Sequence, residues 1–80
     1  MSETGRERLI DARLMPPPEP MERTLEALDD LAPGEEILLL LYREPFPLYP
    51  VLRNNGYTHR TSLRDDGTFE IRIRHAAAPS

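Results

Sequence analysis

Four prolines within five positions, residues 16–20, constrain this chain more than any other stretch of its 80 residues. Proline fixes the backbone angle φ at about −65° and has no N–H, so it suits the first turn of a helix but not the helix interior. The run therefore predicts a rigid turn that ends a strand and begins a helix. We expect the start of this helix to present unpaired backbone N–H groups, which attract anions.

Apolar residues on either side of this turn predict the first two elements. Residues 8–12 are typical of a short strand that ends at an acidic residue. Beyond the prolines, apolar residues recur every three or four positions, as on one face of a helix: Met21, Leu25, Leu28 and Leu31. The Ala-Pro-Gly sequence at residues 32–34 should end this helix, because the residue before proline avoids the helical region and glycine accepts a positive φ.

The second half of the chain predicts a strand, a short helix and a hairpin. Residues 37–41 are one isoleucine and four leucines in a row, typical of a central strand covered on both faces. A second proline-rich turn leads into a short helix from about residue 47, which Asn-Asn-Gly at residues 54–56 should end. Residues 57–63 and 68–74 predict two strands joined by an Asp-Gly turn.

Together these elements predict an α/β (α+β) two-layer sandwich of order βαβαββ, with both helices on one face of a four-stranded mixed sheet. We expect one domain over residues 8–74 and flexible tails at residues 1–7 and 75–80. The other sheet face is open, and alternate leucines of the central strand should lie on it. These leucines are either shielded by arginine stems or form an apolar patch for a homodimer or a partner.

Composition excludes several classes of function. The chain has no cysteine, which removes disulfides, a thiolate nucleophile and thiolate metal sites. Its formal net charge of −4 argues against a nucleic-acid partner. No apolar run approaches the roughly 20 residues of a membrane span, and the first residues do not resemble a signal peptide, so we expect a cytoplasmic protein without a membrane partner.

The reactive side chains predict neither an enzyme nor a cofactor. No hydroxyl lies in a recognisable nucleophile motif. The two histidines, His59 and His75, are far apart in the sequence, so we expect no metal; the alternative is a weak site formed by His59 with a carboxylate.

Three segments resemble the TusA (SirA-like) sulfur-carrier family: Ile-Asp-Ala-Arg at 10–13, Pro-Pro-Glu-Pro-Met at 17–21 and Leu-Ala-Pro-Gly-Glu at 31–35. The resemblance spans roughly residues 8–74 and implies a βαβαββ fold with sheet order 1-2-4-3. In that family the first helix opens with Cys-Pro-x-Pro, and the cysteine carries a persulfide. Here Pro17 stands in the cysteine position, and residues 42–50 look like those of an uncharacterised, cysteine-less branch, a domain of unknown function.

We therefore expect a non-enzymatic interaction or regulatory module that docks a partner protein in redox or sulfur-linked metabolism. Its candidate binding surface joins the proline turn to the end of the central strand, where ligands gather in open α/β sheets: Arg13, Pro17, Pro18, Glu19, Pro20, Arg43 and Glu44. Two simpler interpretations remain, in which the prolines only fix the helix start and Arg43 and Glu44 form a solvated ion pair. The alternative function is a ligand- or metal-binding accessory protein that assists sulfur or redox transfer without its own persulfide cysteine.

Overall fold

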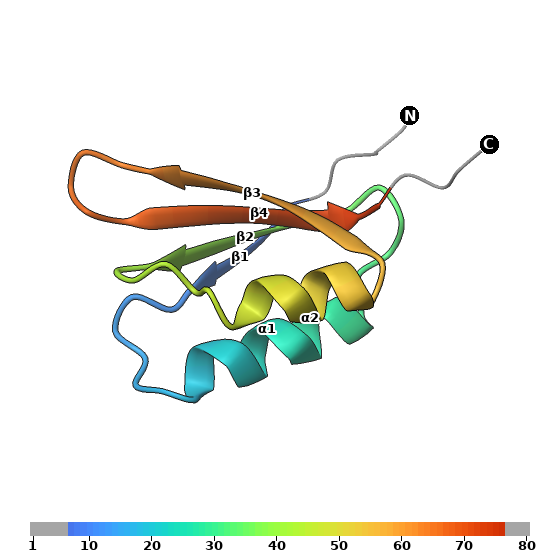
Figure 1. Cartoon of the computed structure of the whole chain (residues 1–80), viewed down its shortest axis with the longest axis horizontal. Helices are drawn as coiled ribbons and strands as arrows, with labels where there is room; N and C mark the ends of the chain where they lie inside the picture. The colour runs from blue at the N-terminus through green and yellow to red at the C-terminus, as the bar shows by residue number, and fades with distance from the viewer. Residues whose placement is uncertain (1–6, 77–80) are drawn as a thin grey trace.

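The computed structural model describes residues 7–76, which form a sheet with two helices packed beneath it (Figure 1). The elements in order are β1 (Glu7–Asp11), α1 (Glu19–Asp29), β2 (Glu36–Leu41), α2 (Leu48–Asn54), β3 (Tyr57–Leu63) and β4 (Phe69–His75). The predicted βαβαββ order is confirmed.

The folded part of the chain is longer at both ends than the predicted domain of residues 8–74. Glu7 begins β1, and His75 ends β4 opposite Tyr57. The Ala76 N–H then donates to the Gly56 carbonyl at 2.9 Å. Glu7, His75 and Ala76 were expected in flexible tails. They belong instead to the folded part, because the backbone pairing of the sheet continues to them. The rest of the predicted tails, residues 1–6 and 77–80, lies outside the described residues.

The sheet has the strand order β1-β2-β4-β3, as the family resemblance implies. β1 pairs with β2 in parallel, whereas β4 runs antiparallel to both of its neighbours, β2 and β3. β2 is therefore an inner strand and β3 an edge strand, as their apolar and mixed compositions predict. The carboxyl ends of β1 and β2 lie together at the same edge of the sheet, next to the start of each helix (Figure 1).

The core lies between the sheet and the helices. Ile37, Leu39 and Leu41 of β2 point toward it and are almost fully buried. Leucines from α2 and isoleucines from β4 complete its centre: Leu48, Leu52, Ile71 and Ile73. The short helix α2 is held by this burial, since Pro50 lies in its first turn, where a missing N–H costs no helical hydrogen bond.

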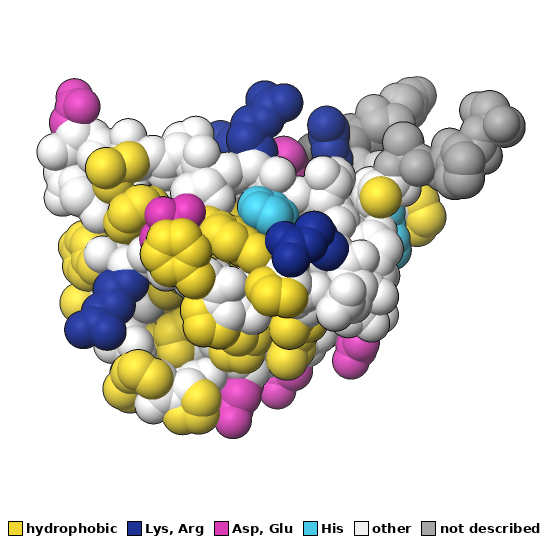
Figure 2. Space-filling view, viewed as in Figure 1, with side chains coloured by type: hydrophobic (Ala, Val, Ile, Leu, Met, Phe, Trp, Pro, Cys, Tyr) yellow, Lys and Arg dark blue, Asp and Glu magenta, His cyan; other side chains and the backbone are white. Residues whose placement is uncertain are grey.

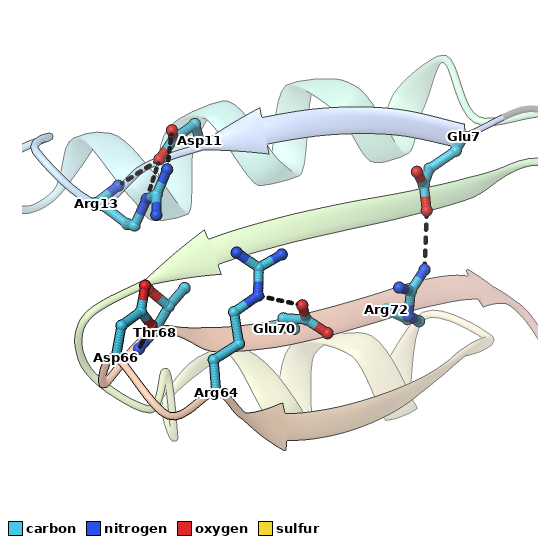
Figure 3. A network of polar contacts seen from close by, with 8 residues as sticks. All are labelled: Glu7, Asp11, Arg13, Arg64, Asp66, Thr68, Glu70 and Arg72. Atoms are coloured by element: carbon cyan, nitrogen blue, oxygen red, sulfur yellow. Dashed lines mark hydrogen bonds and ion pairs between the residues drawn. The ribbon is translucent and has the colours of Figure 1, made fainter.

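Leu38 and Leu40 lie on the open face of the sheet but are only 8% and 4% exposed. Their partners on β4 are Arg72 and Glu70, and the Arg72 side chain extends over β2 to Glu7 on β1, with Nη1 to Oε2 at 2.8 Å (Figure 3). Arg72 is therefore placed to shield Leu38, as one of the two interpretations expects, whereas the strand partner of Leu40 is a glutamate. A homodimer through this face stays a prediction.

Helix α1 differs from its predicted stripe at two points. Thr24 is fully buried, whereas Leu25 is 38% exposed. The Thr24 hydroxyl donates to the Pro20 carbonyl one turn earlier at 2.8 Å, which satisfies the polar group and allows its burial. The helix also ends at Asp29, so Leu31 packs into the core from the following loop.

Candidate functional site

An open pocket of about 500 Å³ lies where the carboxyl ends of β1 and β2 meet the starts of α1 and α2. Six of the seven predicted binding residues line it: Arg13, Pro17, Pro18, Pro20, Arg43 and Glu44. The seventh, Glu19, lines a separate hollow on another side of the proline turn, and its carboxylate lies 3.6 Å from the Arg23 guanidinium. The topology thus brings two proline-rich turns, distant in sequence, to one place.

The pocket is lined mainly by apolar side chains. Its most buried lining residues are Ala12, Thr24, Leu39, Leu41 and Leu48. Partly exposed methionines and prolines from both turns surround this floor: Met15, Met21, Pro17, Pro18, Pro20, Pro45 and Pro47. Figure 2 shows hydrophobic side chains gathered over the starts of the two helices. The pocket therefore suits an apolar group.

The proline turn offers fewer free N–H groups than were expected at the helix start. The Glu19 N–H donates to the Pro16 carbonyl at 2.9 Å, and the Glu22 N–H donates to the Pro18 carbonyl at 3.1 Å. Pro20 has no N–H. Glu19 and Glu22 also place negative charge in this first turn. Anion binding at the start of α1 is thus disfavoured, because two N–H groups of this turn already donate to proline carbonyls and its side-chain charge is negative.

Arg13 forms a two-pronged ion pair with Asp11, the last residue of β1 (Figure 3). Its Nε lies 2.9 Å from Oδ1 and its Nη2 lies 2.7 Å from Oδ2, while its backbone N–H also donates to Oδ1 at 3.3 Å. These bonds lower the pKa of the Asp11 carboxyl to about 2 and raise that of the Arg13 guanidinium. Arg13 therefore holds the turn against β1 and is not a free cation.

Arg43 and Glu44 do not form an ion pair with each other. The Glu44 carboxylate accepts a hydrogen bond from the Tyr49 hydroxyl at 3.0 Å. Arg43 is exposed and makes no ion pair with any residue of the described range. Of the two arginines in the pocket, Arg43 is thus the one available to a bound group.

A cluster of three ring side chains beside the pocket was not predicted from the sequence. Tyr49 of α2 stacks on His59 of β3, with ring centroids 4.2 Å apart and planes within 4°, and Phe46 meets Tyr49 edge-on at 6.0 Å. The Tyr49 hydroxyl also bonds to the Thr61 hydroxyl at 2.7 Å. Burial raises the pKa of Tyr49, and the bond to Glu44 acts in the same direction. The sequence feature that could have predicted this cluster is the spacing of Phe46 and Tyr49, which lie three residues apart in the proline-rich segment.

His59 is thus occupied by an aromatic stack. Within residues 7–76, no group of three or more His, Asp or Glu side chains is arranged to hold a metal ion. None of the described helices is both long and apolar enough to span a membrane.

Comparison with known proteins gives one match. Neither the curated proteins nor the solved structures contain a match to this chain. The model of one protein family, described as "Uncharacterized conserved protein (DUF2249)", matches residues 9–75, which is almost the whole folded part. The chain therefore belongs to the DUF2249 family.

Proposed function

We propose that this chain is a non-enzymatic interaction module that docks a partner protein at the pocket between the ends of β1 and β2. The observation that carries the proposal is that residues 12–24 and 39–48 enclose one apolar hollow of about 500 Å³. Such a hollow accepts an apolar side chain of a partner, and a few anchors of this kind supply most of the binding energy of an interface.

Exposed side chains in and beside the pocket are of types that are enriched at protein interfaces. Tyr42 lines the pocket and is 54% exposed, and Phe46, which lies between the lining residues Pro45 and Pro47, is 65% exposed. Phe46 is held in place by its edge-on contact with Tyr49. Aromatic residues and arginine dominate interface hot spots, and Arg43 lies between these two aromatics in the sequence. A partner that presents an apolar side chain beside a carboxylate matches the hollow and Arg43 together.

The polar groups of the pocket favour binding over catalysis. The Arg13 guanidinium is bonded to Asp11, and the Thr24 hydroxyl is fully buried in its bond to a helix carbonyl. The Glu44 carboxylate is engaged with Tyr49. None of these groups forms a nucleophile with an adjacent base, which acyl transfer and related chemistry require.

The proposed setting in sulfur-linked or redox metabolism rests on the resemblance to the TusA family. The position that carries the persulfide cysteine in that family is Pro17 here, and Pro17 belongs to the pocket wall. A partner that recognises the corresponding surface of a sulfur carrier would therefore meet the same part of this fold without a thiol.

A second candidate is a small-ligand accessory protein. The pocket volume lies within the range of about 300–1,000 Å³ that is usual for small-molecule sites. An apolar carboxylic acid has the same chemistry as the proposed partner anchor. Binding of such acids by the purified chain at micromolar concentration, without any protein partner, would favour this candidate over docking.

The docking proposal is tested by affinity capture from cells that make the protein, with matched variants. Wild type should retain a stoichiometric partner, whereas Phe46→Ala and Arg43→Glu should lose it, because the first removes the exposed ring beside the pocket and the second reverses the free charge. Arg60→Glu is the control: it makes the same charge change at an exposed position on the opposite face of the sheet. Equal capture by all four proteins, or no stoichiometric partner at all, would contradict docking at this pocket.

A further inference from the structure

A second, polar hollow of about 170 Å³ lies on the open face of the sheet, away from the docking pocket. It is lined by Glu36, Thr58, His59, Arg60, Arg72 and Arg74. Three arginines thus converge on one small space in a chain whose formal net charge is −4. Figure 2 shows basic side chains along the edge of the molecule above β3 and β4.

Strand pairing forces these arginines together. Arg60 of β3 lies directly opposite Arg72 of β4, and Arg74 lies two residues further along the same face, opposite Thr58. Like charges directly opposite each other across two strands destabilise a sheet. A sheet that places three arginines in this way needs negative charge to offset their repulsion.

The described residues supply that charge to Arg72 only. Its Nη1 lies 2.8 Å from the Glu7 carboxylate (Figure 3). The same atom lies 3.6 Å from the Glu36 carboxylate. Arg60 and Arg74 are exposed, and neither makes an ion pair or a side-chain hydrogen bond within residues 7–76. Arg72 is therefore fixed by its carboxylates, while the two guanidinium groups on either side of it remain available.

We propose that Arg60, Arg72 and Arg74 bind a tetrahedral oxyanion, an inorganic phosphate or a phosphate group, on the open face of the sheet. The planar guanidinium matches two oxygens of such an anion at once, and the Thr58 hydroxyl adds a donor in the same hollow. The hollow is smaller than the about 300–1,000 Å³ of sites for drug-sized ligands, so it selects the anionic group itself. In the same positive potential a dianion gains about twice the electrostatic energy of a monoanion, so phosphate should bind in preference to chloride.

The site is independent of the proposed docking pocket, because the two hollows share no residue. The test is a titration of the labelled chain with inorganic phosphate, followed by amide chemical shifts at constant ionic strength with chloride as the replaced anion. We expect saturable shifts confined to residues 58–62 and 70–74 and to Glu36, which also lines the hollow. Arg60→Gln and Arg74→Gln should each weaken phosphate binding at least about tenfold, the loss expected for a charged hydrogen-bonding partner.

Arg43→Gln is the matched control, since it removes an unpaired arginine from the other pocket and should leave phosphate binding unchanged. The amide spectra also report whether each variant is folded. Shifts that do not saturate, or that Arg43→Gln reduces as much as Arg60→Gln, would overturn the site as an adventitious surface effect. Binding that requires an oligonucleotide and grows with its length would assign the arginines to a phosphate backbone and would overturn the single-anion site as well.

Discussion

The ring of Tyr49 lies flat on the imidazole of His59, with centroids 4.2 Å apart, and this stack joins α2 to the edge strand β3. The Tyr49 hydroxyl extends the connection, because it bonds to Thr61 on β3 and donates to Glu44 in the loop that leads into α2. One side chain therefore holds together the helix, the sheet edge and one wall of the docking pocket.

Replacement of Tyr49 by phenylalanine keeps the stack and removes both hydrogen bonds. We expect Tyr49→Phe to lower the free energy of unfolding by about 1 kcal/mol, since each bond contributes about 0.5–1.5 kcal/mol and the site is partly exposed. Denaturant unfolding measures this. Tyr42→Phe is the control and should leave stability unchanged, because the Tyr42 hydroxyl bonds to no residue in the described range. Equal effects of the two variants would contradict the role given to Tyr49.

Two leucines of α1 distinguish the buried face that the structure shows from the face that the sequence predicts. Leu28 is 6% exposed and belongs to the core, whereas Leu25 is 38% exposed. Leu28→Ala should cost about 2–5 kcal/mol of stability, the usual range for a buried leucine. Leu25→Ala should cost less than about 1 kcal/mol. Urea denaturation of both variants tests the orientation of the helix, and a larger loss for Leu25→Ala would show that the helix is turned differently.

The Arg13–Asp11 pair predicts a specific pH dependence. The bonds from Arg13 hold the pKa of Asp11 at about 2 in the folded chain, below its ordinary 3.8. Because the folded-state pKa is the lower one, the stability from this pair is fully present above pH 3.8 and is lost as the pH falls through about 2. Arg13→Gln should move the midpoint of Asp11 back toward 3.8, as seen by carboxyl NMR.

The same variant has an internal control. Asp66 owes its lowered pKa first to bonds from Thr68, with only a minor influence of Arg13, so its midpoint should change much less (Figure 3). An Asp11 midpoint that Arg13→Gln leaves near 2 would show that the pair is not the cause.

Arg72 is expected to protect the apolar part of the open face. It lies opposite Leu38 on the neighbouring strand, and its guanidinium binds Glu7 across β2. Arg72→Ala should therefore increase the binding of a hydrophobic dye and lower stability by about 1 kcal/mol, through loss of cover and of an exposed ion pair. Arg60→Ala, which removes an arginine of the same face without a partner carboxylate, should do neither. A dye response equal for the two variants would contradict this shielding.

The fold was predictable because its signals are local. The uninterrupted apolar row of residues 37–41 predicts the inner strand β2, and the alternation of residues 68–74 predicts β4 with one wet face. Helix α1 was predicted as an element but not in its orientation. In the pattern of apolar residues that predicts the buried face, Thr24 is treated as polar. In the structure its hydroxyl bonds to a carbonyl of the same helix, and the side chain is buried.

The candidate site was predictable in its location and only partly in its contents. Parallel strands bring the carboxyl ends of β1 and β2 together, which places Arg13 and Pro17 beside Arg43. Which side chains bond to each other within the site depends on their orientations, which cannot be predicted from the order of residues in the sequence. Glu44 bonds to Tyr49 and not to its neighbour Arg43, and the stack on His59 joins residues on different elements.

The docking pocket is tested most directly by hydrogen exchange on the complex of this chain with the partner it retains. The proposal predicts added protection of backbone amides in residues 12–24 and 42–48, with the open-face segments 58–62 and 70–74 unchanged. The Phe46→Ala chain, mixed with the same partner, should show no added protection. Protection that falls on the open face of the sheet and spares the two proline-rich turns would contradict the account.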